Sequence, residues 1–210
     1  NAALTKAGGK RLRPALYLLC SYDAQLPLKE NASLAASLEL IHMATLVHDD
    51  VVDNAELRRG KPTIKHMYGN RVAMYTGDFI LARALDVITS VEVPSIHRSL
   101  SKTLVQVVEG EIDQIEDKYN LNQNLRDYLR RIKRKTALLI ATSCKLGAIA
   151  SGASYEHAKQ LYRYGYNVGM SFQIIDDILD FTSSPEELGK PTGSDLIQGN
   201  ITLPVLYAME

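Results

Sequence analysis

The sequence predicts an all-α protein, a bundle of helices joined by short connections. Apolar residues recur at helical spacing over long stretches, as at Leu34, Leu38 and Ile41 within residues 31–54. The segments between such stretches are rich in Gly, Pro, Asn and Ser, which is typical of loops. No alternating apolar run is followed by a two-residue hairpin turn, so we expect helices and no sheet.

The predicted helices follow one another along the whole chain. The first begins near Pro14, because proline fits the first turn of a helix, and it runs through Leu19. The same apolar periodicity predicts further helices over residues 31–54, 70–90, 94–118, 125–151, 155–182 and 201–210. Gly, Pro, Asn or Ser residues mark the breaks at 60–62, 93–94, 120–124, 151–152 and 183–191.

Composition narrows the class of protein. The 24 basic and 24 acidic residues cancel, which does not favour a nucleic-acid binder. Hydrophobic residues make up 46% of the chain, as in a globular domain, and no apolar run is long enough to span a membrane. We find no signal peptide, and Cys20 and Cys144 are expected to be free thiols of a cytoplasmic protein. The chain opens with Asn1 and stops inside an apolar run, so we expect that both ends are missing.

Six of the 13 aspartates fall into two clusters with the pattern Asp-Asp-x-x-Asp. On a helix, the first and last residue of this pattern share a face. Carboxylates so close together repel one another unless a cation lies between them, and both clusters stand in apolar surroundings. Ligands that are all oxygen, without clustered His or Cys, favour Mg²⁺. The clusters are Asp49, Asp50 and Asp53, and Asp176, Asp177 and Asp180.

Basic residues accompany these clusters. Lys10, Arg11 and Arg13 follow a Gly-Gly pair, and Arg58 and Arg59 come shortly after the first cluster. Guanidinium groups bind phosphate oxygens through paired hydrogen bonds and stay charged. Each basic group taken alone is also typical of an ordinary exposed surface. Acidic clusters and arginines together favour a site for a metal-bound diphosphate.

These motifs resemble those of the trans-prenyltransferases, the family of polyprenyl diphosphate synthases. The motifs stand in the family's order from residue 8 to beyond residue 204, so the resemblance covers nearly the whole chain. It implies a single domain over residues 1–210 with an isoprenoid-synthase-type helical bundle around a central cavity. The matching segments are residues 8–14, 42, 48–53, 57–63, 77–78, 135–137, 172–181 and 189–191.

The resemblance also implies a reaction, the Mg²⁺-dependent condensation of isopentenyl diphosphate with an allylic diphosphate such as farnesyl diphosphate. Several Mg²⁺ ions would bind with the allylic substrate, on Asp49, Asp50, Asp53, Asp117, Asp176, Asp177 and Asp180. The implied catalytic residues are Asp49, Asp50, Asp53, Lys135, Thr136, Gln173, Asp176, Asp177 and Lys190. The implied substrate-binding residues are Lys10, Arg13, His42, Arg58, Arg59 and Gln114.

Product length is predicted from the residues that precede the first cluster. Ala44 lies five residues before Asp49, about 7.5 Å along the helix, and Thr45 lies one turn before it. Family members with short products tend to carry a bulky aromatic residue at this place. The small side chains of Ala44 and Thr45 therefore imply an open tunnel and a long all-trans product.

Within the family, residues 39–44 and 198–208 are most similar to the catalytic large subunits of bacterial two-component heptaprenyl diphosphate synthases. This implies a heptaprenyl product for a menaquinone side chain, delivered to the membrane, and a small second subunit as partner. Shorter (farnesyl, geranylgeranyl) or other long products stay open, as does a homodimer through residues 94–118 or a neighbouring helix. Asn200 stands where farnesyl-type relatives carry Lys, which puts one phosphate contact in doubt.

Two alternatives from other classes are less favoured. Terpene cyclases usually have a different second cluster and many Trp residues, whereas this chain has a second Asp cluster and no Trp. A head-to-head synthase would not need the basic motif of residues 8–14. A non-catalytic partner subunit would be expected to lose the aspartates, and both clusters are intact here.

Overall fold

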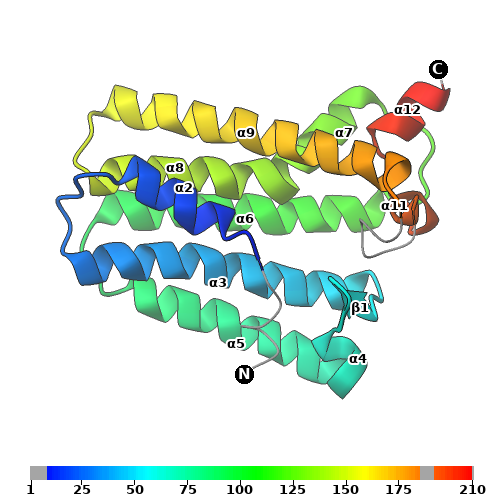
Figure 1. Cartoon of the computed structure of the whole chain (residues 1–210), viewed down its shortest axis with the longest axis horizontal. Coiled ribbons are helices and arrows are strands. Elements are labelled where there is room, and N and C mark those ends of the chain that lie inside the picture. The colour runs from blue at the N-terminus through cyan, green and yellow to red at the C-terminus, as the bar shows by residue number, and fades with distance from the viewer. Residues whose placement is uncertain (1–8, 185–191, 210) are drawn as a thin grey trace.

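The computed structural model describes residues 9–184 and 192–209, and in these segments the chain is almost entirely helical (Figure 1). The all-α prediction is confirmed, and each predicted helix is found with ends that differ by a few residues. The helices are α2 (Leu12–Cys20), α3 (Leu28–Val52), α4 (Ile64–Tyr68), α5 (Asn70–Ile88), α6 (Pro94–Glu116), α7 (Leu125–Ile132), α8 (Leu138–Ala150), α9 (Tyr155–Thr182), α11 (Ser194–Ile197) and α12 (Leu203–Met209), with a π-helix η1 (Lys133–Ala137) between α7 and α8.

The expectation that the chain holds no hairpin is wrong. Strands β1 (Leu57–Arg58) and β2 (Lys61–Pro62) pair antiparallel across a two-residue turn. Arg59 and Gly60 in this turn have φ angles of 52° and 72°, the left-handed values that such hairpin turns require. Two-residue strands are too short to show an alternating pattern, and Arg is an unusual residue for this backbone conformation.

The long helices pack side by side into a bundle, with α3 against α5 and α8 against α2, α6 and α9 (Figure 1). The periodic apolar residues of α3 form the core as expected, because Leu34, Leu38 and Ile41 are at most 1% exposed. Across the part of the chain that the structure describes, no helix combines the length and apolarity that a membrane span needs. Cys20 and Cys144 are free thiols, as predicted.

The π-helix η1 is held closely between two neighbouring helices. An added Cβ at Gly110 of α6 would lie 2.4 Å from Cβ of Arg134, and one at Gly169 of α9 would lie 2.5 Å from Cα of Ala137. Only glycine allows backbones to approach so closely. A π-helical turn inside a longer helix is often found at a functional site, and this one carries Lys135 and Thr136.

Helices α3 and α9 run in the same direction and end at the same end of the bundle (Figure 1). The first aspartate cluster lies at the C-terminal end of α3, with Asp53 directly after the last helical residue. The second lies in the last turns of α9. The C-terminal residues of α6, the β1–β2 hairpin and η1 lie at the same end of the bundle as the ends of α3 and α9 (Figure 1). The topology thus brings five parts of the chain together at the predicted site.

Candidate active site

Asp50 of the first cluster is tied to the hairpin. Its carboxylate accepts a hydrogen bond of 2.7 Å from Nε of Arg58, which the strand β1 places over the end of α3. Asp50 is only 6% exposed. Burial raises the pKa of Asp50, and the charge and hydrogen bond of Arg58 oppose that rise. Arg58 therefore acts on the first cluster as a counter-ion of this carboxylate.

Asp49 and Asp53, the other two members of the first cluster, interact with lysines of other segments. Asp53 lies 3.3 Å from Nζ of Lys118, at the end of α6. Burial raises the pKa of Asp49 to about 7, although the charge of Lys135 opposes it, and the neighbouring carboxylates of Glu111 and Asp53 raise it further. A carboxylate in such surroundings is stabilised by an additional cation.

The second cluster has one exposed and two buried members. Asp176 is exposed. Asp177 is 3% exposed and accepts hydrogen bonds from the hydroxyl of Tyr128 at 2.7 Å and from Nε2 of Gln173 at 2.8 Å. Asp180 is 1% exposed and accepts hydrogen bonds from Oγ of Ser194 at 3.0 Å and from the backbone N–H of Asp195 at 3.2 Å.

The π-helix connects the two clusters through consecutive residues. Lys135 donates a hydrogen bond of 2.9 Å to Oε1 of Gln114, and its charge acts on Asp49 of the first cluster. Thr136 donates a hydrogen bond of 2.6 Å to Oε1 of Gln173, beside the second cluster. The structure thus brings together Gln114, Lys135, Thr136 and Gln173, which the sequence placed in three separate motifs.

A group of basic residues forms a second part of the site. An added Cβ at Gly9 would lie 3.3 Å from Nη1 of Arg59 and 3.6 Å from Oε1 of Glu39, so the glycine lets these side chains approach. Burial lowers the pKa of Arg13 to about 10, and the charge of Glu39 opposes this change. Burial together with the charges of Arg13 and Arg59 lowers the pKa of His42 to about 3, so the imidazole is neutral.

Two buried polar atoms in this basic group have no hydrogen-bond partner among the described residues, namely Nε of Arg13 and Oε2 of Glu39. Buried polar atoms are normally hydrogen-bonded. A bound anion with its water would supply an acceptor for the guanidinium. The positive charges and the Nε–H of Arg13, which has no acceptor among the described residues, therefore fit the phosphate-binding role that the resemblance assigns to Arg13, His42 and Arg59.

The predicted site also includes Lys10, Asp117 and Lys190. Lys10 is exposed, and Asp117 follows the last residue of α6, near Arg131. Lys190 lies outside the described residues. Within residues 9–184 and 192–209, no three His, Cys, Asp or Glu side chains form one group that could hold a metal ion. The complete ligand set stays a prediction.

Sequence reasoning did not identify several residues of this site. Glu39 lies three residues before His42 on the same helix, and this spacing could have found it. Lys118 follows Asp117 directly. Tyr128 and Ser194 carry no signal in a single sequence, because their contacts with Asp177 and Asp180 join segments 49 and 14 residues apart.

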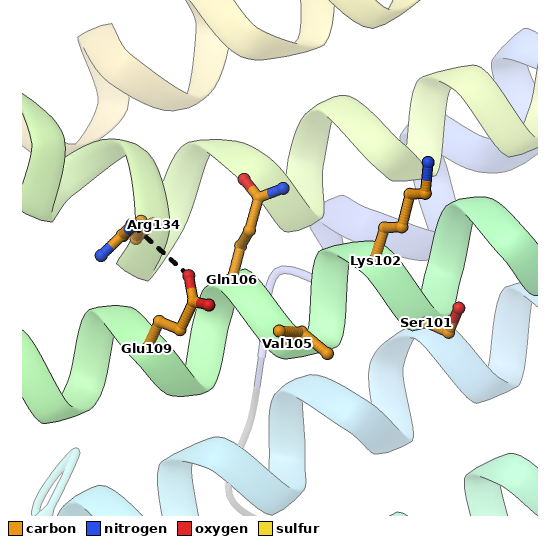
Figure 2. Close-up of a pocket in the computed structure, with 6 residues that line it drawn as sticks. All are labelled: Ser101, Lys102, Val105, Gln106, Glu109 and Arg134. Carbon is orange, nitrogen blue, oxygen red and sulfur yellow. Dashed lines mark ion pairs between the residues drawn. The ribbon is translucent and has the colours of Figure 1, made fainter.

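A surface pocket of about 460 Å³ lies on α6 beside η1 (Figure 2). Arg134 forms an ion pair of 3.3 Å with Glu109 there and also pairs with Asp113. None of its lining residues belongs to the predicted site. They are Ser101, Lys102, Val105, Gln106, Glu109 and Arg134.

An α-helical bundle with two aspartate clusters at one end and a basic group beside them defines the class of isoprenoid synthases. The chain belongs to the polyprenyl synthetase family, which it matches over residues 2–210. It is 63% identical over 207 residues to heptaprenyl diphosphate synthase component 2 of Bacillus subtilis, covering 99% of this chain and 60% of that protein. It is 60% identical to the component 2 of Geobacillus stearothermophilus, covering 98% of this chain and 64% of that protein.

Solved structures agree with this assignment. The heptaprenyl diphosphate synthase of Staphylococcus aureus has a TM-score of 0.94 and 47% identity, covering 99% of this chain and 66% of that one. A polyprenyl synthase of Caulobacter crescentus, solved with calcium and an isoprenyl diphosphate, has a TM-score of 0.94 and 38% identity, covering 99% of this chain and 63% of that one. The chain thus spans somewhat under two thirds of the length of these relatives.

Proposed function

We propose that this chain is the catalytic part of a Mg²⁺-dependent trans-prenyltransferase that lengthens an allylic diphosphate with isopentenyl diphosphate. The observation that carries the proposal is the gathering of both aspartate clusters at one end of the bundle, joined through Lys135 and Thr136 of η1. The basic group of Arg13, His42 and Arg59 beside them supplies a second phosphate site. Names of the relatives support a heptaprenyl product.

The carboxylates fit a divalent cation. Asp49 is a half-buried carboxylate whose neighbours Glu111 and Asp53 repel it, and all donors in both clusters are oxygen atoms. We assign the metal to carboxylates of the two clusters, with Asp117 as a further predicted ligand. Asp50, Asp53, Asp177 and Asp180 also accept hydrogen bonds from the protein, which orient these carboxylates without using all of their lone pairs.

The reaction breaks the C–O bond of the allylic diphosphate, and the electron pair leaves with the diphosphate. Bound Mg²⁺ supplies charge neutralisation for that leaving group. Lys135 adds positive charge beside Asp49, and the resemblance to the family implies that Thr136 and Gln173 would line the allylic cation. Arg13, Arg59 and neutral His42 hold isopentenyl diphosphate while its double bond attacks the cation. A new C–C bond forms, and a proton is lost to the departed diphosphate.

A long product needs space beyond the diphosphates, and Thr45 lies one turn before Asp49 on the same face of α3. Its small side chain leaves this face open, which supports a long-chain product such as heptaprenyl diphosphate. The relatives are named as component 2, which supports a second, smaller subunit as partner. We place the reaction in the cytoplasm, with the product passing to the membrane for a menaquinone side chain.

The test is incorporation of labelled isopentenyl diphosphate by the purified full-length protein, with farnesyl diphosphate as primer. It is run with and without Mg²⁺ and with and without the candidate partner subunit. We expect Mg²⁺-dependent elongation that is lost in Asp49→Ala and in Asp176→Ala. Asp86→Ala is the control, because Asp86 lies exposed on α5 and forms an exposed ion pair with Arg83. Unchanged activity in both cluster variants would contradict the proposal, and full-length product without a partner would contradict the two-subunit assembly.

A further inference from the structure

We propose that Tyr128, held in place by Arg131, is a positioning residue that sets the second aspartate cluster for metal binding through its hydrogen bond to Asp177. This inference deepens the proposed function and rests on it. Neither Tyr128 nor Arg131 belongs to the residues that the motifs identify. Both are buried, with Tyr128 at 0% and Arg131 at 6% exposure.

The hydrogen bond from Tyr128 to Asp177 joins α7 to α9 at a distance of 2.7 Å. Burial raises the pKa of Tyr128, and the bond to Asp177 raises it further, so the phenol keeps its proton and donates. A buried carboxylate with a charge-assisted hydrogen bond is held more firmly than one with a neutral contact. Tyr128 therefore holds one oxygen of Asp177 in a defined place.

The other oxygen of Asp177 is also occupied. Nε2 of Gln173, one turn earlier on α9, donates to it at 2.8 Å, and the amide oxygen of Gln173 accepts from Thr136 at 2.6 Å. Two residues of α9 are thus bonded to α7 and η1, which determines the rotation of this helix about its axis. Asp176 directly precedes Asp177, so the same bonds determine where the exposed carboxylate of Asp176 can lie.

Arg131 supports Tyr128 from the next turn of α7. Its guanidinium carbon is 5.8 Å from the centre of the Tyr128 ring. One nitrogen donates to Oε1 of Gln123 at 2.5 Å, and the other donates to the backbone oxygen of Ile201. Gln123 in turn donates to the backbone oxygen of Asp117 at 2.7 Å.

The buried network of Tyr128, Asp177 and Arg131 carries a free-energy cost that an apolar core would not have. Burying a guanidinium, a phenol and a carboxylate costs free energy that apolar side chains of similar volume would not. All of these polar groups have partners, so the network defines one arrangement of α7, α9 and the segment around Ile201. A network that only stabilised the fold would not need to end on a carboxylate of the acidic cluster.

The experiment compares Tyr128→Phe with Tyr17→Phe in the full-length protein. The control is closely matched, because Tyr17 is also 0% exposed and its hydroxyl donates to Asn31 at 2.5 Å, on α2 and away from the aspartates. Both variants lose one hydrogen bond that a buried tyrosine donates. The readout is the Mg²⁺ concentration that gives half-maximal prenyl transfer, measured beside the unfolding temperature.

We expect Tyr128→Phe to raise the half-maximal Mg²⁺ concentration about tenfold, in the range found for residues that orient metal ligands. Tyr17→Phe should leave the Mg²⁺ dependence at the wild-type value while lowering the unfolding temperature by a similar amount. An unchanged Mg²⁺ dependence in Tyr128→Phe, or the same shift in both variants, would overturn the inference.

A double-variant cycle tests whether Tyr128 acts through Asp177. The Mg²⁺ shift of Tyr128→Phe with Asp177→Asn should equal that of Asp177→Asn alone, and additive shifts would overturn the inference. If Tyr128→Phe does not fold, Arg131→Lys, which removes the paired hydrogen bonds of the guanidinium that supports Tyr128, should shift the Mg²⁺ dependence in the same direction, and no shift would overturn the inference. Calorimetric titration of Mg²⁺ in the presence of inorganic diphosphate measures the same shift without turnover. A protein that shows the shift but transfers no prenyl group would contradict the proposed function and leave this inference standing.

Discussion

The imidazole of His48 occupies the space over Gly77 in which any other residue would carry its Cβ. A Cβ added at Gly77 would lie 2.2 Å from Nε2 of His48, and that nitrogen is 3.2 Å from Oδ1 of Asp78 and 3.3 Å from the backbone oxygen of Met74. His48 directly precedes Asp49. The contact therefore fixes the end of α3 that carries the first cluster against α5.

Gly77→Ala should destabilise the protein by about 1–3 kcal/mol, because the methyl group collides with a ring whose Nε2 contacts both Asp78 and the backbone oxygen of Met74. Urea unfolding measures the free-energy change. His48→Ala removes the ring with which the methyl group collides. In a protein that carries His48→Ala, the further change Gly77→Ala should therefore cost little stability. A Gly77→Ala protein as stable as the wild type would show that α3 and α5 can separate without cost.

Arg58→Ala should destabilise the fold by about 1.5–3 kcal/mol, because it removes a charged hydrogen-bond donor from a buried carboxylate. The side chain of Asp50 is only 9% exposed, so this carboxyl group would be left in a buried place without its charged partner. Arg83→Ala is the control, since the pair of Arg83 and Asp86 is 58% and 63% exposed. Such exposed pairs contribute about 0.2–1 kcal/mol. Equal losses in the two variants would disprove the role of Arg58 as a counter-ion.

His42 should make the stability of the protein depend on pH. Its pKa is about 3 in the folded state against 6.5 for an ordinary histidine, so folding favours the neutral ring. The contribution of His42 to the free energy of unfolding is then complete above pH 6.5 and falls as the pH drops from 6.5 toward 3, by about 1.4 kcal/mol per pH unit at most. Asp49, whose pKa is raised to about 7, contributes in the opposite direction over much of this range, so the effect of His42 is measured as a difference between proteins with and without this side chain.

Urea unfolding between pH 7.5 and pH 4 measures this difference. The stability of the wild type relative to His42→Gln should fall as the pH drops below 6.5, while His157→Gln, at an exposed position of α9, should keep the wild-type profile. A difference between wild type and His42→Gln that does not change with pH would contradict the prediction.

The two residues predicted to control product length should behave differently when enlarged. Thr45→Phe should shorten the product, because a ring on the Asp49 face of α3 blocks the growing chain. Ala44 is 1% exposed and packs in a cluster with Val47, Ala73 and Ile80 between α3 and α5. Ala44→Phe should therefore cost about 1–3 kcal/mol of stability by overpacking.

Chromatography of the products and urea unfolding separate the two effects. Thr45→Val keeps the volume of the side chain and should keep the product length of the wild type. A Thr45→Phe protein that still makes the full-length product would place the tunnel elsewhere.

The helices of this protein could be predicted from the sequence because their signals are local. The spacing of Leu34, Leu38 and Ile41 predicts a buried face, and all three residues are in the core. The hairpin could not be predicted, because its strands have two residues each and its turn places Arg59 at a positive φ of 52°. The ends of α3 and α9 lie at the same end of the bundle (Figure 1) because of the path of the whole chain, which no short segment encodes.

The sequence by itself determined which carboxylates stand together, since the spacing of Asp49, Asp50 and Asp53 on one helix is a local property. Only the tertiary structure decided what each carboxylate does. Arg58 on a hairpin binds Asp50, and Tyr128 on another helix binds Asp177. The donor that reaches a carboxylate comes from a residue far along the chain, and a single sequence records no distance between such residues. Helical spacing can place an aspartate on a face, but packing decides whether that aspartate is occupied by the protein or open to a ligand.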